Sequence, residues 1–216
     1  VRAAAVRGAA RDNTINNFPS VATGVAPRER RQLTGYVMTD SNFKTAVAAW
    51  LSDASAAEAT YGHISTWKTG GVKDMSWLFS ADWARGNSAH AHWSFNEPIG
   101  GWDVRKVTSM SHMFADAKSF NQDISGWQVS KVEKMKRMFL RASSFNKNIG
   151  SWSIEAVTSM NDMFRDASAF DQDLGWCVGK DTDLDLAFEK SKCESTSCGV
   201  AQGQFKTEDG SCAPSP

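Results

Sequence analysis

Residues 107–127 have the sequence VTSMSHMFADAKSFNQDISGW, which returns as VEKMKRMFLRASSFNKNIGSW at 132–152 and as VTSMNDMFRDASAFDQDLGW at 157–176. Trp102, Trp127 and Trp152 are spaced by 25 residues, and the methionines and phenylalanines of the pattern keep the same spacing. The last copy is one residue shorter. Self-similarity at such a period is the sequence signature of repeat architectures. The stretch therefore predicts stacked coils of about 25 residues each.

The repeat extends in both directions with altered spacing. Trp67 and Phe79 lie 35 residues before Trp102 and Phe114, which indicates a ten-residue insertion around DWARGNSAHAHW at 82–93. Phe188 follows Phe164 by 24 residues, so the pattern continues beyond the last complete copy. About four to five coils are expected.

Within one coil, Val107, Met110, Phe114 and Ala117 step by 3, 4 and 3, which is typical of one face of a short α-helix. The stretch FNQDISGW at 120–127 predicts a short strand and a turn. Stacking then gives an α/β solenoid with one short helix and one short parallel strand per coil. Like residues form ladders, and the ladder of Asn96, Asn121, Asn146 and Asp171 is expected to bind turn backbone groups.

Four segments are expected. Residues 1–37 form an extended tail rich in arginine and alanine, 38–62 a capping helix, 63–176 the solenoid, and 177–216 a cysteine-rich cap and tail. In the cap, residues 40–59 place Phe43, Val47, Trp50 and Leu51 on one helix face, with Asp40 or Ser41 at its start. The tail resembles a processed targeting remnant, and we expect it to contact a partner through arginines that include Arg28, Arg30 and Arg31.

All four cysteines lie in the last 40 residues, where the repeat fades. Disulfides are expected, with Cys177 paired to Cys193 and Cys198 to Cys212 because each bond closes a short loop. A zinc site made of the four thiolates is the alternative. Disulfides predict an oxidising compartment, such as an organelle lumen or the cell exterior.

The overall charge is balanced. Lysine plus arginine and aspartate plus glutamate both total 24, which gives no general field for nucleic acid. The apolar runs are too short to cross a bilayer, so membrane contact is expected only through partners.

Two surfaces are candidate contact sites. Residues 127–151 carry a local excess of basic side chains, namely Lys131, Lys134, Lys136, Arg137 and Arg141. A solvated helix face is the alternative interpretation of such a charge run. In the insertion, Trp83 and Trp93 lie outside the ladders and need burial against the coils or a partner.

No pattern indicates catalysis or a cofactor. His90 and His92 can offer two imidazoles to a metal, but a solvated loop is favoured because no third ligand is evident. Asp123, Asp171 and Asp173 can bind calcium, but turn capping is favoured because Asn148 interrupts their column. The chain is expected not to be an enzyme and to hold no metal.

The stretch WDVRKVTSMSHMFADAKSFNQDI at 102–124 resembles the BspA-like surface-protein repeats of bacterial lipoproteins, which also occur in marine microalgae. The resemblance covers about residues 38–200. It implies a leucine-rich-repeat-like α/β solenoid, a location outside the cytoplasm and roles in adhesion or protein binding. No catalytic residues come with it.

The favoured hypothesis is a non-catalytic structural or protein-interaction subunit that docks on a larger assembly, such as a membrane complex in the thylakoid lumen of an alga. The alternative is a cell-surface adhesin or glycan-binding module that uses the tryptophans of the insertion.

Overall fold

The structure is a computed structural model that describes residues 35–80, 89–209 and 211–214. The chain divides into two compact units, Val1–Gln32 and Leu33–Pro216, and the described residues belong to the second. Its elements are β1 (Val37–Thr39), α1 (Phe43–Ser52), α2 (Ala54–Tyr61), the 3-10 helix η1 (Ile64–Thr66), β2 (Lys68–Gly71), α3 (Ala89–Ser94), β3 (Cys177–Val178), the 3-10 helix η3 (Glu194–Gly199), β4 (Ala201–Gln202), β5 (Gln204–Lys206) and β6 (Cys212–Pro214). No helix within these ranges has the length and apolar character needed to span a bilayer.

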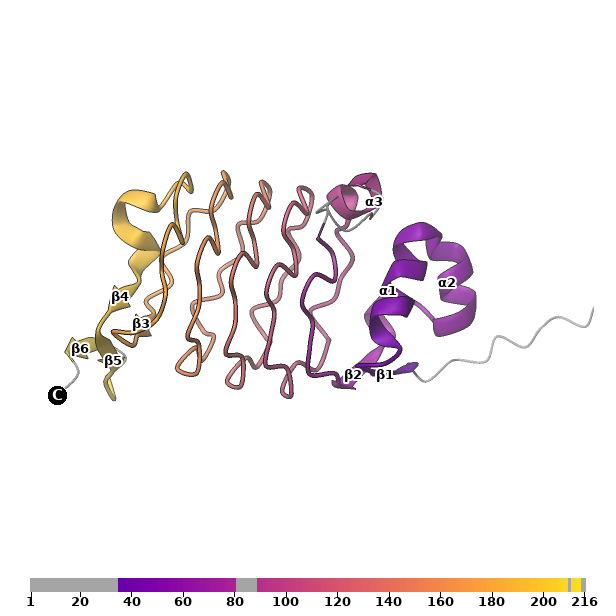
Figure 1. Ribbon diagram of the computed structural model, residues 1–216, viewed down its shortest axis with the longest axis horizontal. Helices are drawn as coiled ribbons and strands as arrows, with labels where there is room; N and C mark the ends of the chain where they lie inside the picture. The colour runs from indigo at the N-terminus through magenta and orange to yellow at the C-terminus, as the bar shows by residue number, and fades with distance from the viewer. Residues whose placement is uncertain (1–34, 81–88, 210, 215–216) are drawn as a thin grey trace, which may run out of the picture. The chain divides into compact units, whose positions relative to one another are not determined.

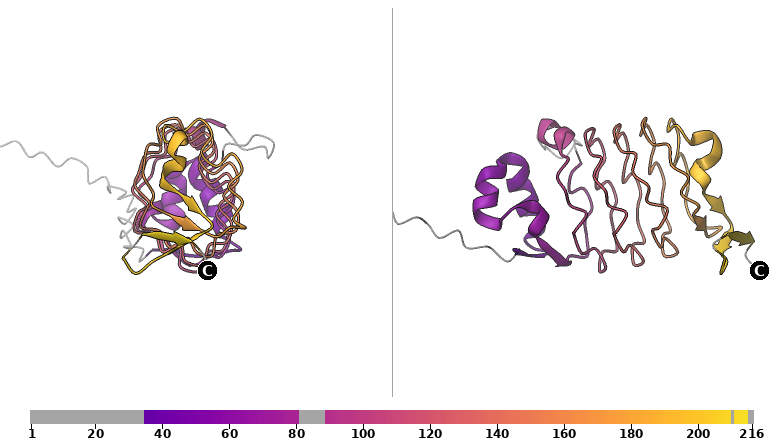
Figure 2. Two further views of the ribbon diagram at one scale, coloured as in Figure 1. Left: turned by 90° about the vertical axis from the view of Figure 1, so that its left-hand side faces the viewer. Right: turned by 180° about the vertical axis from the view of Figure 1, so that it is seen from behind.

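From β2 through η3 the described part of the chain winds in coils, each beginning at a tryptophan. We number them first (67–101), second (102–126), third (127–151), fourth (152–175) and fifth (176–200). One residue of each coil forms a parallel bridge with the next, and the bridged residues are Asp74, Ser109, Lys134, Ser159 and Asp183. The coils lie side by side (Figure 1) and overlie one another when viewed end-on (Figure 2). Whether they belong to the leucine-rich-repeat-like class stays a prediction.

The bridged residues begin a segment that we call the wall, which comprises residues 74–79, 109–114, 134–139, 159–164 and 183–188. In the first four coils, every second N–H of the wall donates to the following coil. Met110 N lies 2.9 Å from Lys134 O, and Phe114 N lies 2.9 Å from Met138 O. The N–H groups between them close local turns, as from Met113 N to Met110 O at 3.1 Å. The wall is therefore hydrogen-bonded between coils rather than along the chain.

This arrangement shows that the short helix expected in each coil is wrong. Ser109 is a bridge residue and residues 111–116 form consecutive turns, with left-handed φ angles of 60° at His112 and 61° at Asp116. A helix would use each N–H within its own chain segment, whereas here alternate N–H groups bind the next coil. The spacing of 3, 4 and 3 was therefore produced by turns that bury Met110 and Phe114.

The strand expected at 120–127 is also absent, because these residues form no ladder hydrogen bonds and the parallel bridges lie in the wall instead. Side chains hold this part of the stack together. Asn121 N donates to Asn96 Oδ1 at 2.9 Å, and Asn146 N donates to Asn121 Oδ1 at 3.1 Å. Asp171 N continues the series to Asn146 Oδ1 at 3.0 Å. The expected asparagine ladder is confirmed.

Aromatic columns fill the interior of the stack. The ring of Phe139 lies 5.5 Å from Phe114 and 5.3 Å from Phe164, centroid to centroid, with nearly parallel planes. Trp127, Trp152 and Trp176 form a second column at 6.3 and 6.4 Å. A single coil cannot bury such rings alone, so the hydrophobic free energy comes from stacking.

The shortened fourth coil leaves one buried indole N–H of the tryptophan column without a hydrogen bond among the described residues. Trp127 Nε1 donates to Ile99 O at 3.3 Å, and Trp152 Nε1 donates to Ile124 O at 3.1 Å. Trp176 Nε1 is buried without an acceptor among the described residues. The deletion of one residue before Trp176 therefore keeps its ring in the column but costs its hydrogen bond.

The N-terminal cap differs from the single helix expected over 40–59. It consists of α1 and α2, separated at Asp53, whose extended backbone ends the first helix and whose carboxylate accepts the N–H of Ala56. The expected face is largely correct, since Phe43, Val47 and Trp50 are buried. Asn42 rather than Asp40 or Ser41 precedes the helix. The rings of Phe43 and Trp50 contact Trp67 edge-on, so α1 covers the first coil.

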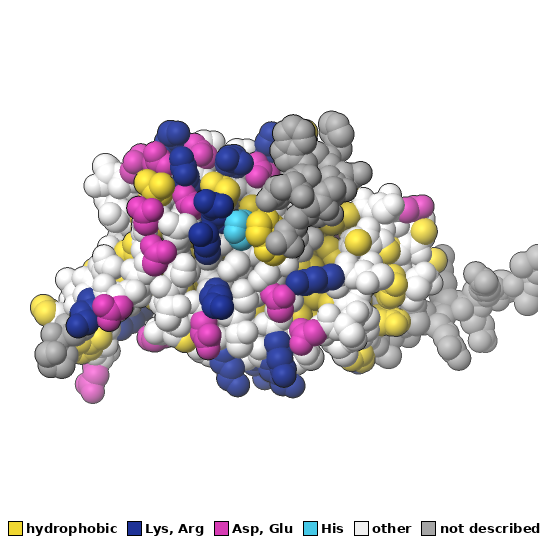
Figure 3. Space-filling model, in the orientation of Figure 1, with side chains coloured by type: hydrophobic (Ala, Val, Ile, Leu, Met, Phe, Trp, Pro, Cys, Tyr) yellow, Lys and Arg dark blue, Asp and Glu magenta, His cyan; other side chains and the backbone are white. Residues whose placement is uncertain are grey.

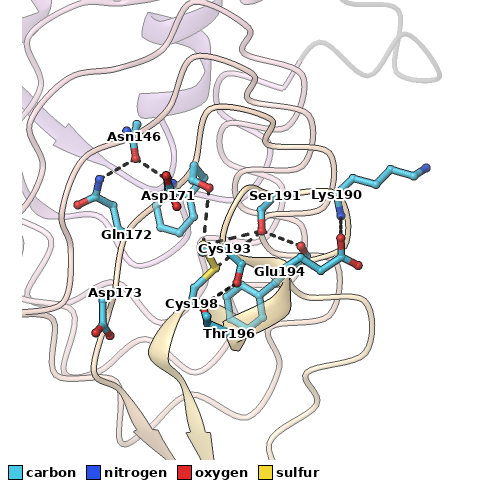
Figure 4. Close-up of a disulfide and its surroundings, with 12 residues drawn as sticks. Asn146, Asp171, Gln172, Asp173, Lys190, Ser191, Cys193, Glu194, Thr196 and Cys198 are labelled. Atoms are coloured by element: carbon cyan, nitrogen blue, oxygen red, sulfur yellow. Dashed lines mark hydrogen bonds between the residues drawn. A yellow bond between two sulfur atoms is a disulfide. The ribbon is translucent and has the colours of Figure 1, made fainter.

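Disulfides close the C-terminal end, but the expected pairing is wrong. Cys177 is bonded to Cys212, and Cys193 is bonded to Cys198 (Figure 4). The hairpin of β5 and β6 folds back toward β3 and brings Cys212 beside Cys177. Cys193 and Cys198 flank a tight turn in η3, and their Cα atoms are 4.8 Å apart. The zinc alternative is wrong because all four sulfurs are in disulfides.

Candidate functional surface

The basic side chains of the third coil separate into two groups. Arg137 and Arg141 form ion pairs with neighbouring coils. Arg137 Nε lies 2.9 Å from Asp162 Oδ2 in the fourth coil, and Arg141 Nη1 lies 3.3 Å from Asp116 Oδ2 in the second. Both arginines have left-handed φ angles, 55° and 54°. These two residues therefore hold the stack together.

Asp162 is the centre of this ionic network. Its side chain is only 3% exposed, and Arg165 Nη1 contacts its second oxygen at 3.1 Å. Burial acts to raise the pKa of Asp162, but hydrogen bonds and charges from Arg137 and Arg165 outweigh it, so the pKa lies below the usual 3.8. The carboxylate is therefore ionised wherever the protein is folded near neutral pH.

Lys131, Lys134 and Lys136 form the second group, which we call the lysine face. All three are exposed, and none forms an ion pair within the described residues. Lys134 is bridged to Ser109 on one side and to Ser159 on the other. The flanking coils thus present short uncharged side chains beside it. Figure 3 shows one face of the molecule, where basic and acidic side chains are mixed.

The insertion supplies the second candidate. Trp83 and the side chain of His90 lie outside the described residues, as do Arg28, Arg30 and Arg31. Trp93 is half-buried in α3, and Lys118 Nζ lies 4.3 Å from its ring centroid. Trp93 O also accepts the N–H of Ser119 at 2.9 Å. One face of this ring is therefore already covered by an ammonium group of the second coil.

Of the two histidines considered as metal ligands, His92 is the one whose side chain the structure describes. His92 is buried, and burial lowers its pKa against the opposing effect of a hydrogen bond with the Phe79 backbone. Its neutral ring packs beside the first coil. No group of three or more potential metal ligands occurs in the ranges that the structure describes.

The column of Asp123, Asn148 and Asp173 caps turns. Asp123 Oδ1 accepts the N–H of Ser125 at 3.0 Å and its hydroxyl at 2.7 Å, and these bonds hold the pKa of Asp123 below its usual value. Asn148 and Asp173 accept the N–H two residues on, at 2.8 and 3.2 Å. A shallow groove of about 670 Å³ lies between Ser125, Ser151 and Gly175. Each oxygen that faces its own turn is unavailable to a cation.

Cross-coil ion pairs were missed by the sequence interpretation, although a signal was present. Arg137 and Asp162 have opposite charges at a spacing of 25 residues, and so do Asp116 and Arg141. In a stack of coils this spacing places side chains next to each other. The pattern distinguishes structural arginines from the lysines that remain available.

Comparison with known proteins places the chain in a family. The model of the family described as "Mycoplasma protein of unknown function, DUF285" matches residues 86–198, which is more than half of the 216 residues. No curated protein and no solved structure gives a significant match. The matched range contains the second, third and fourth coils and most of the fifth. The chain therefore belongs to the DUF285 family.

Proposed function

We propose that the chain is a non-catalytic interaction subunit that binds an acidic surface of a partner protein through its lysine face. One observation carries this proposal: the two arginines of the third coil are bound by carboxylates, whereas Lys131, Lys134 and Lys136 are exposed and lack an ion pair within the described residues. Like charges held on a rigid surface attract a partner of opposite charge and orient it.

The class of the stack is part of the same proposal. Coils that recur every 24 or 25 residues and are joined by parallel bridges support a solenoid of the leucine-rich-repeat-like class. The repeat resembles those of BspA-like surface proteins, which supports an interaction role. Two disulfides indicate an oxidising compartment. An organelle lumen with a larger photosynthetic membrane assembly is the finer location that we propose.

Charge reversal tests the lysine face. The tagged chain is expressed in its source organism as the wild type and as the variant Lys131→Glu/Lys134→Glu/Lys136→Glu, and the proteins that copurify are quantified. The matched control is Lys180→Glu/Lys192→Glu/Lys206→Glu, which changes three exposed lysines outside the third coil. The lysine-face variant is expected to lose its partner at least tenfold, because each exposed pair contributes up to about 1 kcal/mol.

Retention of the same partners by the lysine-face variant would overturn the proposal. Equal loss in the control would show that net charge, rather than this face, determines binding. Circular dichroism of the purified variants shows that both remain folded, since none of the six lysine side chains forms an ion pair within the described residues.

A further inference from the structure

From the second residue of the wall onward, the hydrogen bonds between coils run in one direction. Met160 N donates to Asp183 O at 2.7 Å, Asp162 N to Asp185 O at 2.9 Å, and Phe164 N to Ala187 O at 2.7 Å. The same positions of the first, second and third coils also donate to the coil that follows. At these alternate positions each coil therefore presents N–H groups toward the C-terminal end of the stack and receives hydrogen bonds on carbonyl groups that point toward the N-terminal end.

The fifth coil has no following coil, and its donors stay open. The N–H groups of Leu184, Leu186 and Phe188 correspond to those of Met160, Asp162 and Phe164, and none has an acceptor among the described residues. We call these three N–H groups and the side chains around them the donor edge. An unpaired backbone N–H is uncommon in a folded protein, so three at alternate positions require an explanation.

Both flanks of the donor edge are capped by side chains. On one side, Gln202 Nε2 donates to Thr182 O at 2.8 Å. On the other side, the carboxylate of Glu194 accepts the N–H of Lys190 at 3.0 Å (Figure 4). The cap thus satisfies the backbone groups that border the donor edge and leaves the three between them open.

The side chains of the donor edge are acidic and apolar. Asp183 and Asp185 are exposed, and neither forms an ion pair within the described ranges. The side chain of Leu186 is 43% exposed, and its backbone has a left-handed φ of 53°. An occupant must therefore supply hydrogen-bond acceptors, positive charge and apolar contact.

An ordinary β-strand does not meet this requirement. Its edge presents N–H and C=O groups in alternation, so it would place N–H groups against the N–H groups of the donor edge. The chain's own coils show the arrangement that fits, because Lys134 O and Lys136 O accept from Met110 and His112 at alternate positions. The occupant is an extended segment that turns every second carbonyl toward the edge.

The earlier coils also give the register of such a segment. The residue that accepts the N–H of Met110 is Lys134, and the same residue is bridged to Ser109. By the same relation, the residue that accepts the N–H of Leu184 lies beside Asp183, and the one that accepts the N–H of Leu186 lies beside Asp185. The intervening position lies over Leu184 and the next one over Leu186.

We propose that the donor edge is a docking site for an extended segment of a partner protein with the pattern basic, apolar, basic, apolar. The two basic side chains pair with Asp183 and Asp185, and the apolar ones cover Leu184 and Leu186. Backbone carbonyls of the two basic residues accept the N–H groups of Leu184 and Leu186, and the carbonyl two residues further along the segment accepts that of Phe188. This site is separate from the lysine face. The donor edge binds a basic segment, whereas the lysine face binds an acidic surface.

Amide resonances of the full chain, labelled with ¹⁵N, test the site directly. The probe is the acetylated and amidated peptide Gly-Lys-Leu-Lys-Leu-Gly, and the control peptide has glutamate in place of both lysines. The lysine peptide is expected to shift the amide signals of Leu184, Leu186 and Phe188 and to slow their hydrogen exchange at least tenfold. The amides of Met160, Asp162 and Phe164 serve as internal controls, because they are already hydrogen-bonded.

A pair of variants separates charge recognition from folding. Asp183→Asn/Asp185→Asn keeps the acceptor oxygens that bind Asp185 N and Asn161 Nδ2, so it preserves the local hydrogen bonds. This variant is expected to bind the lysine peptide with about tenfold lower affinity. Glu155→Gln/Asp181→Asn removes two other exposed charges and is expected to leave binding unchanged.

Three results would overturn the proposal. The first is slow exchange of the three amides in the free protein, which would mean that the edge is covered. The second is an equal response to the acidic peptide. The third is no response to the lysine peptide at millimolar concentration.

Discussion

The guanidinium Nε of Arg137 lies 2.9 Å from Asp162 Oδ2 and joins two coils across a separation of 25 residues. Both residues are in the left-handed region, with φ angles of 55° and 54°. Such a conformation is costly for Arg137, since among residues other than glycine only asparagine and aspartate adopt it readily. The ion pair and the wall hydrogen bonds offset that cost, so charge and backbone geometry are coupled in this column.

Replacement of Asp162 by asparagine is expected to lower the free energy of unfolding by about 2 kcal/mol. The change removes the buried counter-charge of Arg137 and Arg165. The effect is below that of a fully buried pair because both arginines are about a third exposed and Arg165 keeps Glu189 Oε2 at 2.7 Å from its Nε. Urea denaturation measures the loss. Asp116→Asn is the control, with a loss below about 1 kcal/mol because Arg141 is more exposed.

The same carboxylate predicts a pH dependence. The folded pKa of Asp162 lies below the unfolded value near 3.8, so its contribution is complete above about pH 4 and is lost as the pH falls through the folded pKa. Stability measured from pH 5 downward should fall more steeply in the wild type than in Asp162→Asn. Parallel curves would contradict the assignment.

The disulfide pairing predicts a distinct tryptic map without reductant. Trypsin releases Cys177 in 166–180, Cys212 in 207–216, and both Cys193 and Cys198 in 193–206. The observed bonds join the first two peptides and leave the third as a single, internally bridged peptide. Joining of all three peptides would instead show the local pairing expected from the sequence.

The two disulfides are expected to contribute unequally to stability. In the chain-entropy model, the bond between Cys177 and Cys212, which spans 35 residues, contributes about 4 kcal/mol, and the bond between Cys193 and Cys198, which spans five, about 2 kcal/mol. Alanine replacement of each pair, followed by thermal denaturation, tests the order. A larger loss from the short loop would mean that packing of η3 dominates.

Asn42 is expected to prevent further strand pairing at β1. Its Oδ1 accepts the N–H of Thr39 at 2.8 Å, and its Nδ2 donates to Val37 O at 3.2 Å. The amide thus occupies the edge of β1 that faces away from β2. Asn42→Ala is expected to cost about 1 kcal/mol and to cause concentration-dependent association, because an open strand edge pairs with other chains.

Light scattering after size exclusion measures that association. Ser41→Ala is the matched control, since within the described ranges the Ser41 side chain bonds the hydroxyl of Thr39 and no strand backbone group. A monomeric Asn42→Ala variant at high concentration would show that the edge is protected in another way.

The ring columns predict that the stability lost on removing a ring depends on whether the ring lies in the middle or at the end of its column. Phe139 is fully buried and stacks on Phe114, Phe145 and Phe164, whereas Phe188 has a ring contact only with Phe164 among the described residues. Phe139→Ala is expected to cost about 3–5 kcal/mol and Phe188→Ala about 2 kcal/mol. Chemical denaturation provides the comparison, and equal losses would contradict a column built from neighbour contacts.

The spacing of identical residues was enough to predict the columns, because Phe114, Phe139 and Phe164 can only be buried together if the coils stack. The conformation within a coil was not predictable from the same residues. A spacing of 3, 4 and 3 is typical of a helix, but turns with left-handed residues such as His112 produce it as well. What decides between them is the destination of alternate N–H groups, which is a property of the neighbouring coil.

The lysine face was visible in the sequence as part of a larger basic cluster, but its limits were not. Arg137 and Arg141 belong to that cluster by sequence and to the ionic network by structure. The donor edge could not be found from residue types at all, because it consists of backbone groups. Only the direction of the wall hydrogen bonds reveals it.

That direction has an electrostatic consequence. Peptide groups that are aligned head to tail from coil to coil add their dipoles, each of about 3.5 D, as they do along an α-helix. The fifth coil is the positive end of these rows. Five acidic residues lie between 181 and 194, against two lysines, namely Asp181, Asp183, Asp185, Glu189 and Glu194 against Lys190 and Lys192. The acidic end of the stack thus corresponds to the acidic first turn of a helix, and its contribution should weaken with salt.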